Sequence, residues 1–130
     1  MSLAFKPILL VFLGGGIGSA LRLLVLHAAR LWLPPSFPYG TLTVNVVGGL
    51  AAGMIASVLV GRGGGGADPM SLFLITGVLG GFTTFSAFSL DAYLLWQRGD
   101  AAAALAYVLT SVLLSIAAVV AGFAAVRALS

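Results

Sequence analysis

Four long apolar stretches dominate this sequence and leave it little freedom in how it can fold. The second and fourth contain no charged residue, and the stretches cover residues 8–29, 40–61, 71–97 and 101–126. A helix rises about 1.5 Å per residue, so roughly 20 apolar residues cross the hydrocarbon core of a bilayer. All four stretches reach that length. The sequence therefore predicts four transmembrane helices.

The connections between these stretches are short. Residues 33–39 (LPPSFPY) hold three prolines, residues 61–69 (GRGGGGADP) form a glycine-rich linker, and residues 97–100 (QRGD) form a tight break. Nothing here is long enough for a second folded unit. We expect an all-α integral membrane protein whose residues 1–130 make up one transmembrane domain in a lipid bilayer.

The beginning of the chain also resembles a secretory signal, with Lys6, an apolar core and the small residues Gly18, Ser19 and Ala20. The apolar run does not end there but continues past Arg22. That continuation favours a retained first helix over a cleaved signal.

Composition excludes several classes of function. The chain is 61% hydrophobic and only 7% charged, whereas soluble domains carry about 25% charged residues. The net charge of +3 comes from scattered basic residues, so no face for nucleic acid is expected. The chain has no Cys, no Glu, three Asp and the single histidine His27. These are too few groups for acid–base or metal catalysis, so we expect a protein that is not an enzyme.

The charges give little indication of orientation in the membrane. With four spans, Lys6, Arg62 and Arg127 share one side, and Arg30 and Arg98 share the other. Three against two is almost no positive-inside bias. A small chain with few charges explains this balance, and so does insertion in both orientations with pairing into an antiparallel homodimer.

Polar residues inside the first two spans have two interpretations each. Arg22 either extends to an interface or forms the cationic wall of an aqueous vestibule. Thr41 and Asn45 are four residues apart and share one helix face. The Asn45 amide either bonds a neighbouring helix or offers N–H groups to an anion.

Three hydroxyl groups recur at intervals of four residues on the last span, at Tyr107, Ser111 and Ser115. Each step turns the helix by only about 40°, so the hydroxyls form a stripe. A single serine often bonds the carbonyl four residues earlier in its own helix. Three hydroxyl groups on one helix face indicate a polar track along the last span.

Residues 80–89 (GGFTTFSAFS) are an unusual segment for a membrane helix. Glycine and threonine are poor helix formers, and we expect the third helix to break near residues 80–86 and to restart. Broken helices expose carbonyl groups for a cation and N–H groups for an anion. Phe85 and Phe88 could point their electropositive ring edges at an anion, although packing is the commoner role of such rings.

Small residues also recur at G-x-x-x-G spacing. The pairs are Gly14 with Gly18, Gly49 with Gly53, and Gly77 with Gly81. Such spacing permits close approach of helices in lipid. We predict this role for the first two pairs.

Three segments together resemble the fluoride channel family called Fluc or CrcB. They are GGFTTFSAFS (80–89), GTLTVNVVGG (40–49) and GGGIGSALR (14–22), and the resemblance covers essentially the whole chain. It implies a passive, fluoride-selective ion channel that exports cytoplasmic fluoride across the inner (plasma) membrane of a prokaryotic cell. It also implies an antiparallel, dual-topology homodimer with two pores and a structural sodium ion (Na+) at the dimer interface.

The resemblance assigns roles to individual residues. Those implied for the fluoride pathway are Asn45, Phe85, Phe88, Tyr107, Ser111 and Ser115. Those implied for the vestibule are Arg22, Thr41 and Ser86. The backbone carbonyls of Gly80 and Thr83 are implied as sodium ligands. Departures from the family pattern are Ala87 in place of Thr, Asp91 where Glu is common, and the apolar Val119 at the end of the polar track.

Other functions fit the residues less well. A small dual-topology drug/proton antiporter needs an acidic residue within the membrane, and here the one candidate, Asp91, is expected near a helix end. An intramembrane enzyme lacks the reactive groups. A non-transporting assembly subunit leaves the stripe of hydroxyls unexplained.

Overall fold

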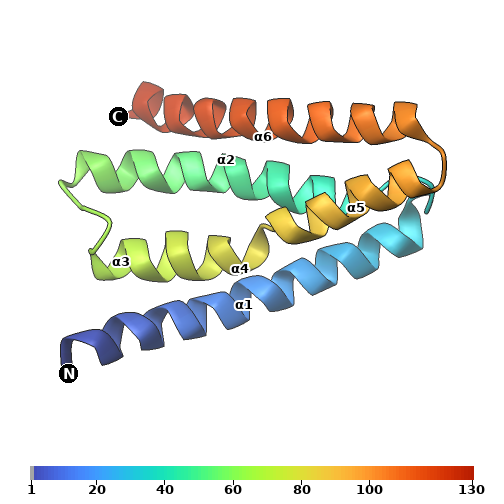
Figure 1. Cartoon of the computed structure of the whole chain (residues 1–130). Coiled ribbons are helices and arrows are strands. Elements are labelled where there is room, and N and C mark those ends of the chain that lie inside the picture. Colours follow the sequence, from blue (N-terminus) through green and yellow to red (C-terminus); the bar gives the residue numbers. More distant parts are fainter. Residues whose placement is uncertain (1) are drawn as a thin grey trace.

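The computed structural model describes residues 2–130, and side chains from residue 4 onward, as a bundle of four long helical spans (Figure 1). Its elements are α1 (Ser2–Trp32), α2 (Tyr39–Gly61), α3 (Pro69–Ser71), the π-helical segment η1 (Leu72–Leu79), α4 (Gly80–Phe82), α5 (Phe85–Gln97) and α6 (Ala101–Leu129). Four segments are long and apolar enough to cross a membrane, namely Ala4–Trp32, Tyr39–Gly61, Pro69–Gln97 and Ala101–Leu129. The predicted four-span, all-helical architecture is confirmed.

Two of the three acidic residues begin helices. The Asp68 carboxylate accepts hydrogen bonds from two backbone N–H groups at the start of α3, and Asp100 accepts one at the start of α6. Such caps satisfy N–H groups that have no partner within the helix. Gly63 and Gly99 take φ values of 71° and 80° in the preceding turns, a backbone region that glycine enters without strain. Local sequence therefore sets where these spans begin.

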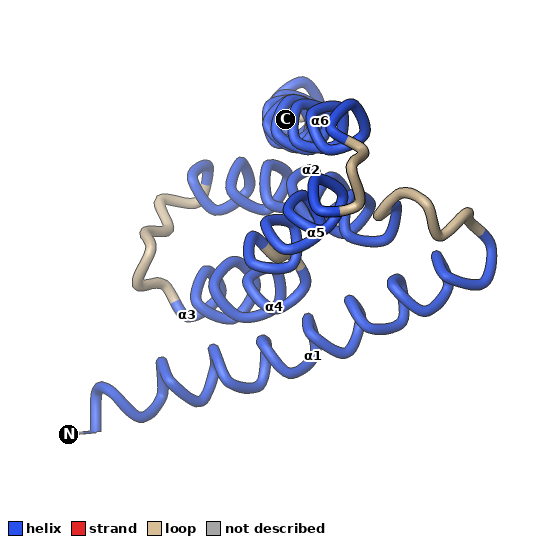
Figure 2. The backbone as a smooth tube through the Cα atoms, turned by 45° about the vertical axis from the view of Figure 1, so that its right-hand side comes forward, coloured by secondary structure: helices blue, strands red, loops and turns tan. Residues whose placement is uncertain are grey.

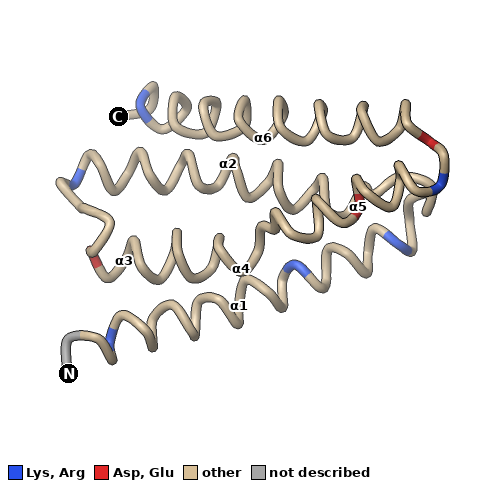
Figure 3. Tube along the Cα trace, in the orientation of Figure 1, with Lys and Arg blue, Asp and Glu red and all other residues tan. Residues whose placement is uncertain are grey.

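The spans pack as two pairs (Figures 1 and 2). α2 lies along α6, and α1 lies along η1 and α4. Both termini and the linker between α2 and α3 lie at one end of the bundle, with the loop after α1 and the turn after α5 at the other. Figure 3 shows basic residues at both ends and one near the middle of α1, where Arg22 lies.

Glycines allow α1 to approach the third span at backbone contact distance. A Cβ atom added at Gly14 would lie 2.6 Å from the carbonyl oxygen of Phe73, and one added at Gly18 would overlap the carbonyl oxygen of Val78. Ordinary van der Waals contact begins at about 3.5 Å, so no larger residue fits without a shift of backbone. The packing role predicted for this pair is confirmed.

The other two glycine pairs also face neighbouring helices. A Cβ at Gly49 would lie 2.9 Å from a carbonyl oxygen of α6, and one at Gly53 would overlap another. Gly77 and Gly81 face the backbone of α1 in the same way. The second predicted pair is thus confirmed, and the third pair, to which we assigned no packing role from the sequence, shares it.

Large apolar side chains cover the outside of the bundle. Trp32, Phe12, Leu113 and Val120 are each more than 60% exposed, whereas Val44 and Tyr107 are fully buried. An apolar exterior around a small interior is stable in lipid rather than in water. This distribution, together with the four spans, defines a multi-pass membrane protein.

Replacing Gly18 with alanine should weaken the bundle, because the new methyl group meets backbone that cannot rotate away. We expect Gly18→Ala to lower stability by about 1–3 kcal/mol. The measurement is thermal unfolding of the purified protein in detergent. Gly16→Ala, two residues away on a side with nothing within 4 Å, is the matched control and should keep the parent stability. Equal behaviour of the two variants would contradict glycine-mediated packing.

Candidate functional site

Two residues of extended backbone separate α4 from α5. Thr83 has φ −82° and ψ 162°, and Thr84 has φ −153° and ψ 125°. α5 begins directly afterwards, and the Thr84 hydroxyl oxygen accepts a hydrogen bond of 3.1 Å from the N–H of Ala87. Thr84 is thereby the N-cap of α5. Extended backbone at membrane depth needs such partners, because lipid supplies none.

The Asn45 side chain of α2 holds this segment in place. Its Oδ1 accepts a hydrogen bond of 2.8 Å from the N–H of Thr84, and its Nδ2 donates one of 2.9 Å to the carbonyl oxygen of Thr84. The two bonds fix the orientation of the amide, since only the oxygen can accept from an N–H group. Gly48, one turn later, leaves room for the segment, because a Cβ there would overlap the methyl group of Thr83.

These contacts take the helical hydrogen-bond donors away from two backbone carbonyl groups. In a continuous helix the carbonyls of Gly80 and Thr83 would accept from the N–H groups of Thr84 and Ala87, four residues later. Those N–H groups donate instead to Asn45 Oδ1 and to the Thr84 hydroxyl. The carbonyls assigned by resemblance to a sodium ion are therefore the two whose helical donors are diverted.

Arg22 and Ser86 both lie near this segment. Nη1 of Arg22 lies 3.5 Å from the carbonyl oxygen of Thr83, so the side chain reaches the third span rather than the end of its own helix. The Ser86 hydroxyl lies 3.4 Å from that of Thr84. Thr41, the third predicted vestibule residue, lies elsewhere and donates to Asp91. The structure does not gather the three in one cavity, and their shared role stays a prediction.

A groove of about 520 Å³ runs between α2, the third span and α6. It brings together most of the residues predicted for the fluoride pathway and for the cation, namely Asn45, Phe85, Phe88, Ser111, Ser115, Gly80 and Thr83. Val119 continues its lining with an apolar surface. The helix faces proposed from sequence spacing therefore converge on one space.

The two predicted phenylalanines differ in burial. Phe88 is 8% exposed and packs within the bundle, whereas Phe85 is 78% exposed, and their ring centroids lie 5.6 Å apart. The exposed Phe85 ring lies at the edge of the groove, where lipid or another apolar surface can cover it.

Ser111 has an unusual environment. In the part of the chain from residue 4 onward, its hydroxyl oxygen is the buried side-chain polar atom without a hydrogen-bond partner, and the residue is only 4% exposed. The common alternative, a bond to the carbonyl four residues earlier, is not made. A buried hydroxyl normally finds a partner, and this one lines the groove. Its hydrogen-bonding capacity is thus unused by the described part of the chain.

Tyr107 is fully buried and does not line the groove. Its hydroxyl donates to Oδ2 of Asp91 at 3.3 Å, and the Thr41 hydroxyl donates to the same oxygen at 2.7 Å. The Tyr107 ring packs against Phe88, with ring centroids 5.3 Å apart. Tyr107 therefore connects the groove to a hydrogen-bonded cluster around Asp91, and its role in the pathway stays a prediction.

The placement of Asp91 differs from the sequence prediction. We expected it near a helix end, but it lies in the middle of α5, partly buried, with two hydroxyl donors. The sequence did not reveal these hydrogen bonds to Asp91, because the two hydroxyl donors come from other helices, α2 and α6. Thr84 was also missed as the partner of Asn45. A threonine followed by a restarting helix is an N-cap signal that could have identified it.

The fold and this site define a class of membrane protein. Three of the four membrane spans line a groove that offers an unpartnered hydroxyl and carbonyl groups without their helical donors, and such groups can replace water around a small ion in a membrane protein.

Comparison with known proteins identifies the family. Residues 9–123 match the family model described as "CrcB-like protein, Camphor Resistance (CrcB)". A relative from Paracoccus denitrificans (strain Pd 1222), named "Fluoride-specific ion channel FluC", is 56% identical over 120 residues, which cover 92% of this chain and 93% of the relative. Relatives of the same name from Rhodopseudomonas palustris (strain BisB5) and Rhizobium meliloti (strain 1021) are 49% and 50% identical, each aligned with 94% of this chain and with 98% and 97% of their own lengths.

The chain therefore belongs to the CrcB-like family. This confirms the resemblance found in the three sequence motifs. It also confirms the expectation that the chain is not an enzyme.

Changing Asn45 to aspartate should disturb the segment it holds. Aspartate keeps the oxygen facing the N–H of Thr84 but places a second oxygen against the Thr84 carbonyl, so one hydrogen bond is replaced by repulsion. We expect Asn45→Asp to destabilise the protein by about 1–3 kcal/mol, measured by thermal unfolding in detergent. Thr43→Ala is the control on α2, because that exposed hydroxyl bonds only its own helix. Parent stability of Asn45→Asp would show that the two bonds do not hold the segment.

Proposed function

We propose that this protein is a passive, fluoride-selective channel that exports cytoplasmic fluoride across the inner membrane of a prokaryotic cell. The observation that carries the proposal is the groove, which joins the unpartnered Ser111 hydroxyl to Asn45, Ser115 and the two phenylalanine rings. The names of the relatives, which are fluoride-specific ion channels, support the same ion.

Fluoride is small and strongly hydrated, so a pathway must replace much of its water shell. Ser111 and Ser115 offer hydroxyl donors. Asn45 uses one of its two N–H groups on Thr84 and keeps the other. The ring edges of Phe85 and Phe88 add weaker electropositive contacts. Weak, multiple contacts suit conduction, because an ion held too tightly does not leave.

The direction of transport follows from the membrane potential. Hydrogen fluoride crosses lipid as a neutral acid and dissociates in neutral cytoplasm. A negative interior then drives the anion outward with about 2.3 kcal/mol per charge per 100 mV. No proton-carrying group is required, and a passive channel suffices.

We further propose an antiparallel homodimer. The groove is open along one side of the chain, and Phe85 and Gly80 are exposed beside it. A second copy related by a twofold axis would cover this surface and enclose each groove. The near balance of basic residues at the two ends of the bundle supports insertion in both orientations.

A structural sodium ion fits the same interface. The carbonyls of Gly80 and Thr83 have lost their helical donors, and hard cations take oxygen ligands. The Thr83 carbonyl also accepts a long contact of 3.5 Å from Arg22 Nη1, which a bound sodium ion would have to displace or share. Two copies would supply four such oxygens, which would join the subunits. We expect purified protein to unfold at a lower temperature in potassium than in sodium at matched ionic strength, after prolonged depletion of sodium. Equal unfolding temperatures would count against the ion.

A drug/proton antiporter receives no support from the relatives. Asp91, the acid that such exchange would use, accepts two hydroxyl hydrogen bonds within the bundle.

The proposal is tested by fluoride efflux from liposomes that contain the purified protein. The parent should release fluoride without added protons or cations, and chloride far more slowly. Ser111→Ala should reduce the fluoride rate roughly tenfold, since a hydrogen bond to an ion contributes about 1.5–3 kcal/mol. Its stability should be unchanged, because the hydroxyl bonds no protein group. Ser89→Ala, which removes a hydroxyl bonded to its own helix, is the control. A parent that releases no fluoride would overturn the proposal.

Dual topology predicts that a tag at the C-terminus will be found on both faces of the membrane. The measurement is labelling of a single cysteine placed after Ser130, with a reagent that does not cross the membrane, before and after permeabilisation. Roughly equal fractions are expected. Labelling confined to one face would contradict antiparallel pairing and leave the channel function untouched.

A further inference from the structure

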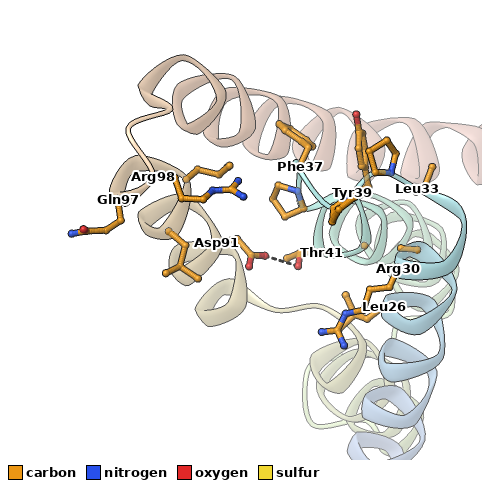
Figure 4. A pocket seen from close by; sticks show the side chains of 16 residues that line it. Leu26, Arg30, Leu33, Phe37, Tyr39, Thr41, Asp91, Gln97 and Arg98 are labelled. Carbon is orange, nitrogen blue, oxygen red and sulfur yellow. Dashed lines mark hydrogen bonds between the residues drawn. The ribbon is translucent and has the colours of Figure 1, made fainter.

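A second cavity lies at the end of the bundle opposite the two termini. It has a volume of about 620 Å³ and is formed by the end of α1, the loop that follows, the start of α2 and the second half of α5. Figure 4 shows the guanidinium groups of Arg30 and Arg98 on either side of the hydrogen-bonded pair of Thr41 and Asp91. Two cations and one carboxylate give this lining a net positive charge.

The arginines are not neutralised by Asp91. Both hydrogen bonds that the Asp91 carboxylate accepts come from hydroxyl groups, those of Thr41 and Tyr107. The Arg98 guanidinium donates to the backbone carbonyl of Ser36, a neutral group. Arg30 is exposed at the rim. Neither guanidinium group is paired with the Asp91 carboxylate, so both can attract an anion that enters the cavity.

One layer of side chains separates this cavity from the groove. Thr41 and Asp91 belong to the cavity, and Phe88 belongs to the groove. Tyr107 touches both sides, since its hydroxyl bonds Asp91 and its ring packs on Phe88. Tyr107 thus connects the cavity to the groove through contacts at the two ends of its side chain, one turn along α6 from Ser111.

We propose that this cavity is an anion-collecting mouth of the channel, in which Arg30 and Arg98 concentrate fluoride before it enters the path. This inference rests on the proposed function and adds a role for two residues outside the groove. Clefts lined by one sign of charge raise the local concentration and the arrival rate of the opposite ion by about 10- to 1000-fold, and salt screens the effect. In an antiparallel dimer each face of the membrane would carry one such mouth.

The test compares fluoride flux at two ionic strengths. At about 0.01 M the Debye length is about 30 Å, and at about 1 M it is about 3 Å. The double variant Arg30→Gln/Arg98→Gln should conduct roughly three- to tenfold less than the parent at low ionic strength and equally at high ionic strength. Arg30→Lys should restore most of the flux lost in Arg30→Gln, because charge rather than planar geometry is required. Arg127→Gln, which removes a charge that does not line the cavity, should have a much smaller effect.

Each remaining outcome overturns the inference. If the parent conducts fluoride and the double variant conducts it equally well at low ionic strength, the proposed role of the two arginines is wrong, whereas the proposed channel function is unaffected. If Arg127→Gln reduces flux as strongly, the effect belongs to the net charge of the protein. If the loss appears only in vesicles with phosphatidylglycerol and not in pure phosphatidylcholine, the cavity holds a lipid phosphate. Thermal unfolding of Arg98→Gln checks that the bond to Ser36 is not the cause, and Arg30→Gln, which breaks no such bond, tests the charge alone.

Discussion

The pair of hydrogen bonds between the Asn45 amide and the backbone of Thr84 is the interaction on which the centre of this protein depends. Lipid provides no partner for extended backbone, so the segment between α4 and α5 is stable only where a side chain replaces the missing helical bonds. Asn45 supplies one donor and one acceptor in one rigid group. In doing so it takes the N–H that the carbonyl of Gly80 would otherwise receive. Support of the extended segment and loss of the helical donor of the Gly80 carbonyl are thus two results of the same contact.

Close packing of glycines makes that contact possible. Asn45 and Thr84 lie on different spans, and the bond lengths of 2.8 and 2.9 Å require backbones that nearly touch. Gly48 leaves the space that Thr83 occupies, and Gly18 lets α1 approach the third span from the other side. In lipid there is no hydrophobic force between helices, so such fitted contacts provide much of the association. Glycines therefore lie where the helices touch, while many of the large apolar side chains face outward.

The polar groups form two clusters with different chemistry. Ser111 is buried without a partner among the described residues and lines the groove, so its hydroxyl has an unused hydrogen bond. Tyr107, one turn earlier, is already bonded to Asp91 and is fully buried. Sequence spacing assigned both residues to one stripe of hydroxyls. The structure places them on the same helix face, but only the Ser111 hydroxyl is without a hydrogen-bond partner, because the Tyr107 hydroxyl donates to Asp91.

The sequence by itself determined the four spans, their short connections and the weak helix propensity of residues 80–89, because span length, prolines and glycines act locally and lipid tolerates few alternatives. The family followed from three short motifs. Tertiary structure alone decided the partner of Asn45, the position of Asp91 between Thr41 and Tyr107, and the packing of Gly77 and Gly81 on α1. These contacts join residues 16 to more than 60 positions apart, and which faces meet depends on how the helices cross. That geometry results from the packing of all four spans together, and no local pattern encodes it.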